Sequence, residues 1–72
     1  MEKWNVRIKK IRKLHNLTQK QVAISLGIAE QAYQRYEYGK VSPGIDFLLS
    51  LADFYQVSLD YLVGRSDDPE MK

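Results

Sequence analysis

Apolar residues recur along the chain at intervals of three and four positions, the spacing that places them on one face of a helix. Trp4, Ile8 and Ile11 form the first stripe, in a helix expected over residues 5–15. Asn16 follows it and can take the left-handed conformation that ends a helix. No segment alternates apolar and polar residues over the length of a strand, so the pattern predicts an all-α fold.

A second stripe predicts a helix over residues 45–55, with Gly44 as an acceptable N-cap. Its members are Ile45, Leu48, Ala52 and Tyr55, with Leu49 and Leu51 beside them. Ser58 can cap a short final helix over residues 59–63, which Gly64 ends.

The strongest local signal lies between these helices. Thr18 and Gln21 have the spacing of a capping box, in which each side chain accepts from the other residue's backbone N–H. Gly27 ends this helix, and the next one begins almost at once, over about residues 29–38, before Gly39. A connection this short forces two helices to cross steeply, so the pattern predicts a tight helix-turn-helix and five short helices in all.

The helix over residues 29–38 has two different sides. At about 100° per residue, one side carries Ala29, Tyr33 and Tyr36, and the other carries Gln31, Gln34, Arg35 and Tyr38. In a major groove, an amide can form paired hydrogen bonds with adenine, and a guanidinium can do so with guanine. An ordinary solvated helix face is the alternative.

Glu37 falls near the inward edge of this helix, where a carboxylate needs a partner. Arg12 lies one turn after Ile8, at the edge of the same core. We therefore expect an Arg12–Glu37 ion pair; the alternative is that both side chains are simply exposed.

Charge divides the chain into two halves. Residues 1–40 carry nine Lys and Arg against three acids, whereas residues 41–72 carry two against six. The first half therefore has a net charge of +6 and the second −4. A basic half suits a polyanion such as DNA, and an acidic opposite end would orient the protein on it, although an ordinary solvated surface also explains such a charge distribution.

Composition excludes several classes of protein. The chain has no Cys and a single His, so no metal, disulfide or cofactor is expected. Nothing resembles a signal peptide or a membrane span, so a cytoplasmic protein without membrane contact is expected. Residues 1–64 are expected to form one domain, and residues 65–72 a loose polar C-terminal tail.

The chain resembles the phage repressor/Cro-like helix-turn-helix domains, also called the xenobiotic-response-element family. The resemblance covers about residues 6–64. It is carried by Leu17-Thr18-Gln19, Val22-Ala23, Leu26-Gly27-Ile28, Tyr33, Arg35-Tyr36-Glu37, Gly39-Lys40, Pro43, Leu48, Leu51-Ala52 and Val57 to Leu62. It implies a lambda-repressor-like fold of five helices, with the third helix in the major groove of double-stranded DNA.

The resemblance also implies roles for individual residues. Base contacts map to Glu30, Gln31, Ala32, Gln34 and Arg35, and phosphate contacts to Gln19, Lys40 and Ser42. Family members commonly pair the residues at positions 12 and 37. The chain departs from the family at Ala29, which offers no side-chain cap; at Glu30, whose charge could weaken DNA binding or accept from cytosine; and at Tyr38.

The leading interpretation is a sequence-specific transcriptional regulator, a repressor that acts as a homodimer. A protein-interaction adaptor of the same fold is the second interpretation. An enzyme is the third interpretation, but the sequence offers no recognisable nucleophile and no phosphate-binding loop. The resemblance also allows a protein partner, an antirepressor or a toxin, which the sequence does not identify.

Dimerisation is expected through the C-terminal end, because the third helix must face DNA. The expected interface residues are Val57, Leu59, Tyr61 and Val63. Trp4 could join them or cover the core. The alternative is that Val57 and Leu59 are core residues and the chain pairs only on DNA.

Overall fold

The computed structural model describes residues 2–70, so residue 1 of the expected domain and residues 71–72 of the expected tail lie outside it. The described part is all-helical, and its helices are α1 (Trp4–Leu14), α2 (Gln19–Leu26), α3 (Glu30–Glu37), α4 (Ile45–Tyr55) and α5 (Leu59–Leu62). The all-α prediction is confirmed, and each helix begins and ends within one or two residues of its predicted bounds. Among residues 2–70, no helix is long and apolar enough to cross a membrane.

Local signals set the ends of α2. The Thr18 hydroxyl accepts from the backbone N–H of Gln21 at 3.0 Å, and the Thr18 N–H donates to the Gln21 side chain at 2.8 Å. At the other end, Gly27 has a φ of 71°, a left-handed conformation that other residues adopt at a cost. Both ends of α2 are therefore fixed by contacts within a few residues, and the turn to α3 is short.

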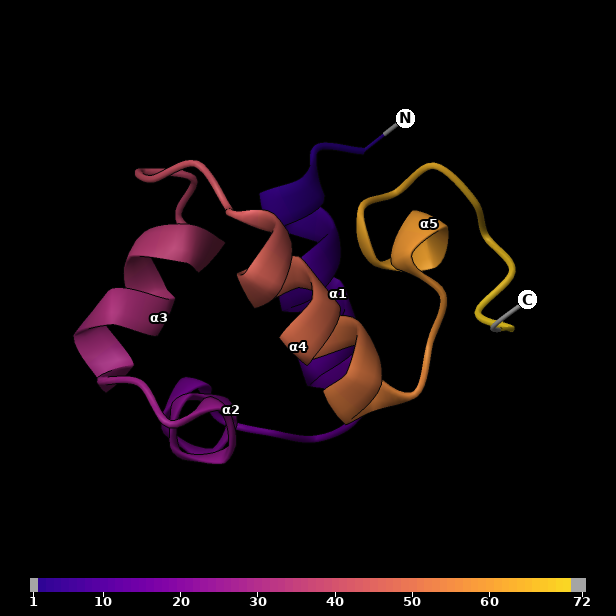
Figure 1. Ribbon diagram of the computed structural model, residues 1–72. Helices are drawn as coiled ribbons and strands as arrows, with labels where there is room; N and C mark the ends of the chain where they lie inside the picture. Colours follow the sequence, from indigo (N-terminus) through magenta and orange to yellow (C-terminus); the bar gives the residue numbers. More distant parts are fainter. Residues whose placement is uncertain (1, 71–72) are drawn as a thin grey trace.

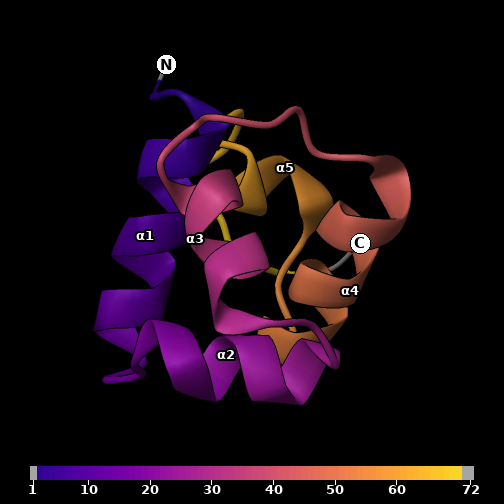
Figure 2. The same ribbon diagram turned by 90° about the vertical axis from the view of Figure 1, so that its left-hand side faces the viewer.

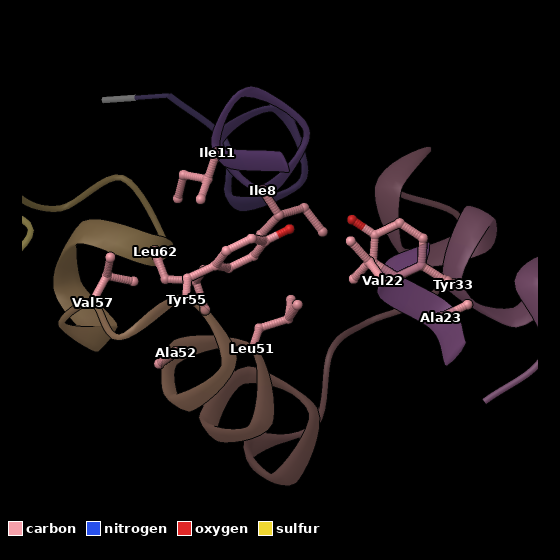
Figure 3. Packing of buried hydrophobic residues seen from close by; sticks show 10 residues of the cluster. All are labelled: Ile8, Ile11, Val22, Ala23, Tyr33, Leu51, Ala52, Tyr55, Val57 and Leu62. Carbon is pink, nitrogen blue, oxygen red and sulfur yellow. The ribbon is translucent and has the colours of Figure 1, made fainter. Parts of the chain in front are cut away.

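A single core joins the helices. Its fully buried members come from all of them: Ile8 and Ile11 of α1, Val22 of α2, Tyr33 of α3, Leu51 of α4 and Leu62 of α5. Figure 3 shows these side chains converging beneath α1. Beside this core, the rings of Tyr36 and Phe47 stack at 3.8 Å and hold α3 against α4.

Three details of the predicted core are wrong. Ile45 and Leu49 of α4 are exposed, whereas Leu51, Ala52 and Tyr55 of the same predicted set are buried as expected. Ala29 is exposed as well, because it is the N-cap of α3 and lies before its first turn.

The residues after α5 fold back against this helix and form backbone hydrogen bonds with it and with the residue before it. The backbone N–H groups of Arg65 and Ser66 donate to the carbonyl oxygen of Asp60, and the N–H of Ser58 donates to that of Pro69 at 3.0 Å. The described part of the expected tail thus contacts both ends of α5.

The arrangement leaves α3 accessible. In Figure 1, α2 and α3 lie at one end of the molecule, and α5 with the C-terminal segment lies at the other. Turned by 90°, α3 lies in front, between α1 and α4 and above α2 (Figure 2). One side of α3 therefore faces solvent along its whole length.

Candidate nucleic-acid interface

The outermost side of α3 carries Gln31, Arg35 and Tyr38, spaced four and three residues apart. All three are exposed, and the side chain of Tyr38 remains 55% exposed. The side chains of Gln31 and Arg35 are free to meet a ligand with an amide and a guanidinium. These two groups match the donor and acceptor patterns of adenine and guanine in a major groove.

Ala32 lies on another side of the same helix. It is half-buried beside Leu26 and Phe47, in a shallow groove between α3 and α4. Although Ala32 is expected to contact bases, it therefore does not share the exposed side that carries Gln31 and Arg35.

A third side of α3 is tied to α2. The Gln34 Nε2 donates to Gln19 Oε1 at 3.1 Å and to Glu30 Oε2 at 3.4 Å. Gln34 and Gln19 are both half-buried, whereas Glu30 is exposed. Sequence periodicity placed Gln34 with the free outward residues, but in the structure its amide group is held by neighbours.

The expected ion pair between Arg12 and Glu37 is present in the structure. Arg12 Nε donates to Glu37 Oε2 at 2.9 Å, and Nη2 donates to Oε1 at 2.7 Å. The third nitrogen, Nη1, donates to the carbonyl oxygen of Leu17 at 2.9 Å. The pair thus joins α1, the start of α2 and the end of α3, which fixes how α3 is presented.

The ionisation of Glu37 follows from these contacts. Burial alone would raise its pKa, since desolvation disfavours a charged carboxylate. The hydrogen bonds from Arg12 and Gln19 outweigh burial, and the net effect lowers the pKa of Glu37 below its ordinary value. The hydrogen bond to Glu37 raises the pKa of Arg12 in turn, so both groups are charged at neutral pH.

The lowered pKa predicts loss of stability in acid. The folded state binds a proton on Glu37 less readily than the unfolded chain, so this contribution is complete above pH 4.5 and disappears as the pH falls below it. In an NMR titration, the Glu37 carboxyl carbon is expected to have its midpoint below 4.5. The free energy of unfolding should fall over the same range. A midpoint at or above the ordinary value would contradict the assigned hydrogen bonds.

The loop after α3 is anchored to α1. Asn5 Nδ2 donates to the carbonyl oxygen of Glu37 at 3.4 Å, and a Cβ added to Gly39 would lie 3.0 Å from the same nitrogen. Lys40 and Ser42, the expected phosphate contacts, are both exposed on this loop. The role of Asn5 could not be predicted from the sequence, because no periodicity or cap signal marks a side chain that supports a loop from another helix.

The residues expected at the dimer interface separate into two groups. Val57 is a core residue with 6% of its surface exposed, so its assignment to an interface is wrong. Leu59, Tyr61 and Val63 are half-buried, and the Arg7 guanidinium lies over the Tyr61 ring at 5.1 Å. Val63 lines a mostly apolar groove with Trp4, Pro43 and Leu48.

Known proteins resemble this chain in sequence. A family model described as helix-turn-helix matches residues 8–62. The HTH-type transcriptional regulator YobD of Bacillus subtilis is 44% identical over 66 residues, which cover 92% of this chain and 59% of that protein. The cryptic phage CTXphi transcriptional repressor RstR of Vibrio cholerae is 41% identical over 54 residues, 75% of this chain and 48% of that one. The chain thus spans about half the length of these curated relatives.

Solved structures resemble it in fold. The P22 c2 repressor, crystallised with a synthetic operator, superposes with a TM-score of 0.80 at 26% identity, over 92% of this chain and all of that one. A transcriptional regulator from Listeria innocua superposes with a TM-score of 0.78 at 29% identity, over 86% of this chain and 58% of that one.

Proposed function

This chain belongs to the helix-turn-helix family, and we therefore propose that it regulates transcription by binding specific DNA sequences, acting as a repressor in the cytoplasm. The proposal is supported by the P22 c2 repressor, which shares the fold and was crystallised on operator DNA. It is also supported by the phage repressor RstR, which shares the sequence.

One observation carries the proposal for this chain. The exposed side of α3 presents Gln31 and Arg35 at the end of the molecule opposite α5 (Figure 1). Lys40 and Ser42 follow on the next loop, and Gln19 lies at the start of α2, so groups suited to phosphates flank the groups suited to bases. That is the layout of a recognition helix that enters a major groove between two backbone contacts.

Replacing Gln31 with alanine is expected to weaken binding to the best DNA site by about 1–3 kcal/mol, the worth of one paired hydrogen bond to a base. Binding to unrelated DNA should stay the same, because phosphate contacts remain. Titration of both DNAs, followed by fluorescence anisotropy, measures the two affinities. Gln21→Ala serves as the control, because Gln21 lies on α2 and its amide accepts from the backbone N–H of Thr18 at the start of the same helix. An equal loss on both DNAs for Gln31→Ala would contradict base contact.

We propose further that the chain binds DNA as a homodimer. One recognition helix contacts only a few base pairs, too few to distinguish an operator from the competing sites of a genome. The groove of Trp4, Pro43, Leu48 and Val63 is mostly apolar and is lined by Glu2, Lys3 and Arg65 as well. A second copy would cover it together with Leu59 and Tyr61, the other half-buried residues expected at the interface.

A charge placed in this groove should separate the protomers. Val63→Asp is expected to weaken self-association about ten-fold or more, because a carboxylate buried against Trp4, Pro43 and Leu48 loses its hydration. Ile24→Asp is the matched control, since Ile24 is 67% exposed on α2 and lines neither this groove nor the one beside Tyr61. Sedimentation equilibrium measures both variants and the wild type. A wild-type monomer that binds a site without two-fold symmetry one-to-one would contradict the dimer.

A further inference from the structure

A chain of hydrogen bonds leads from the buried ion pair to the exposed start of α3. Gln19 Nε2 donates to Glu37 Oε1 at 3.2 Å. Gln34 Nε2 then donates to Gln19 Oε1, and also to Glu30 Oε2. Four side chains from two helices are thus connected, from a carboxylate that is 3% exposed to one on the surface.

The direction of these hydrogen bonds is fixed at the buried end. An ionised carboxylate only accepts, so Gln19 has to turn its Nε2 toward Glu37. The Oε1 of Gln19 then faces Gln34, so Gln34 has to donate to it from its own Nε2. Because that nitrogen carries two hydrogens and both are engaged, Gln34 has none left to donate to a ligand.

The start of α3 therefore offers acceptors alone on this side. Glu30 contributes a carboxylate, and the free group of Gln34 is its carbonyl oxygen. In the major groove, guanine presents the acceptors O6 and N7, and thymine presents the acceptor O4. A carboxylate is itself an acceptor, so it is repelled by these atoms. Adenine presents a donor next to the acceptor N7, whereas cytosine presents only its N4 amino donor. Cytosine is therefore the base that best matches the Glu30 carboxylate, which accepts hydrogen bonds and has no donor beside it.

We propose that Glu30 selects a cytosine in each half of the DNA site, and that Gln34 is the positioning residue that holds the Glu30 carboxylate in place. This inference rests on the proposed DNA-binding function and specifies one base that α3 contacts. Gln34 acts through Glu30 and Gln19, so its role differs from that of Gln31 and Arg35, whose side chains are exposed.

The test is selection of bound sites from random DNA by the wild type and by Glu30→Gln. The wild type should enrich a motif with a cytosine at one position of each half-site. The amide of Glu30→Gln can both donate to N7 and accept from N6, so the same position should change to adenine, with a preference shifted about ten-fold. Asp53→Asn makes the same change of charge on α4 and should leave the motif unchanged.

Gln34→Met tests the positioning role. Its thermal melting should resemble the wild type's, while its preference for cytosine at that position falls several-fold. Equal weakening for all four bases would show a structural role only and overturn the assignment of Gln34. A wild-type motif whose bases are all retained by Glu30→Gln would overturn the inference but leave DNA binding intact. A wild type that selects no motif would overturn both the inference and the proposed function.

Discussion

Glu37→Ala is expected to destabilise the domain by about 3–5 kcal/mol, the cost of leaving a buried charged partner uncompensated. Arg12 would lose both carboxylate contacts, at 2.9 and 2.7 Å, and would keep only the Leu17 carbonyl oxygen. Small domains have little stability to lose, so most molecules should be unfolded at 37 °C or melt well below the wild type. Urea denaturation followed by circular dichroism measures the change.

A double replacement separates the charge from the packing. Arg12→Met with Glu37→Leu removes both charges and keeps much of the volume, so it should recover most of the stability lost by either single variant. Arg35→Ala is the control, because Arg35 is exposed and its loss should cost under about 0.5 kcal/mol. Single and double losses that simply add would mean that the pair contributes no coupling.

The affinity for DNA is expected to fall by roughly a thousand-fold between about 50 and 200 mM salt. The estimate assumes about three phosphates neutralised by each protomer of a dimer, and each neutralised phosphate releases condensed counterions. The basic half of the chain, with a net charge of +6 over residues 1–40, is the origin of this dependence. Anisotropy titrations at several salt concentrations give the slope directly.

Lys40→Ala should lower that slope by about one for each protomer and weaken binding to all DNA sequences alike. Lys9→Ala is the matched control, since Lys9 is an exposed cation on α1 that is not among the expected phosphate contacts and does not line the groove of Val63. Affinity that does not change with salt would contradict a phosphate-contacting role for the loop after α3.

The sequence predicted best those features that depend on neighbouring residues. Thr18 with Gln21 and the glycine at position 27 set the ends of α2 by contacts within a few residues, and the structure has them as predicted. The Arg12–Glu37 pair joins distant residues, yet helical periodicity placed both of them at one edge of the core.

Features that depend on how helices pack could not be predicted in this way. Val57, in the connection between α4 and α5, is buried, whereas Ile45 of α4 is exposed. Both outcomes depend on how the helices pack, which periodicity within one helix does not contain. The engagement of Gln34 depends on a side chain of α2 that lies fifteen positions away in sequence. The contact of Asn5 with the end of α3 likewise depends on how two helices pack together.

The central claim is that the exposed side of α3 determines which DNA the protein binds. Selection of sites from random DNA, carried out in parallel with the wild type and with Gln31→Ala/Arg35→Ala, tests it most directly. The wild type should enrich an inverted repeat whose half-sites lie about one helical turn, roughly 34 Å, apart. The double variant should still bind DNA at low salt but enrich no such repeat. The same motif from both proteins, or none from the wild type, would contradict the claim.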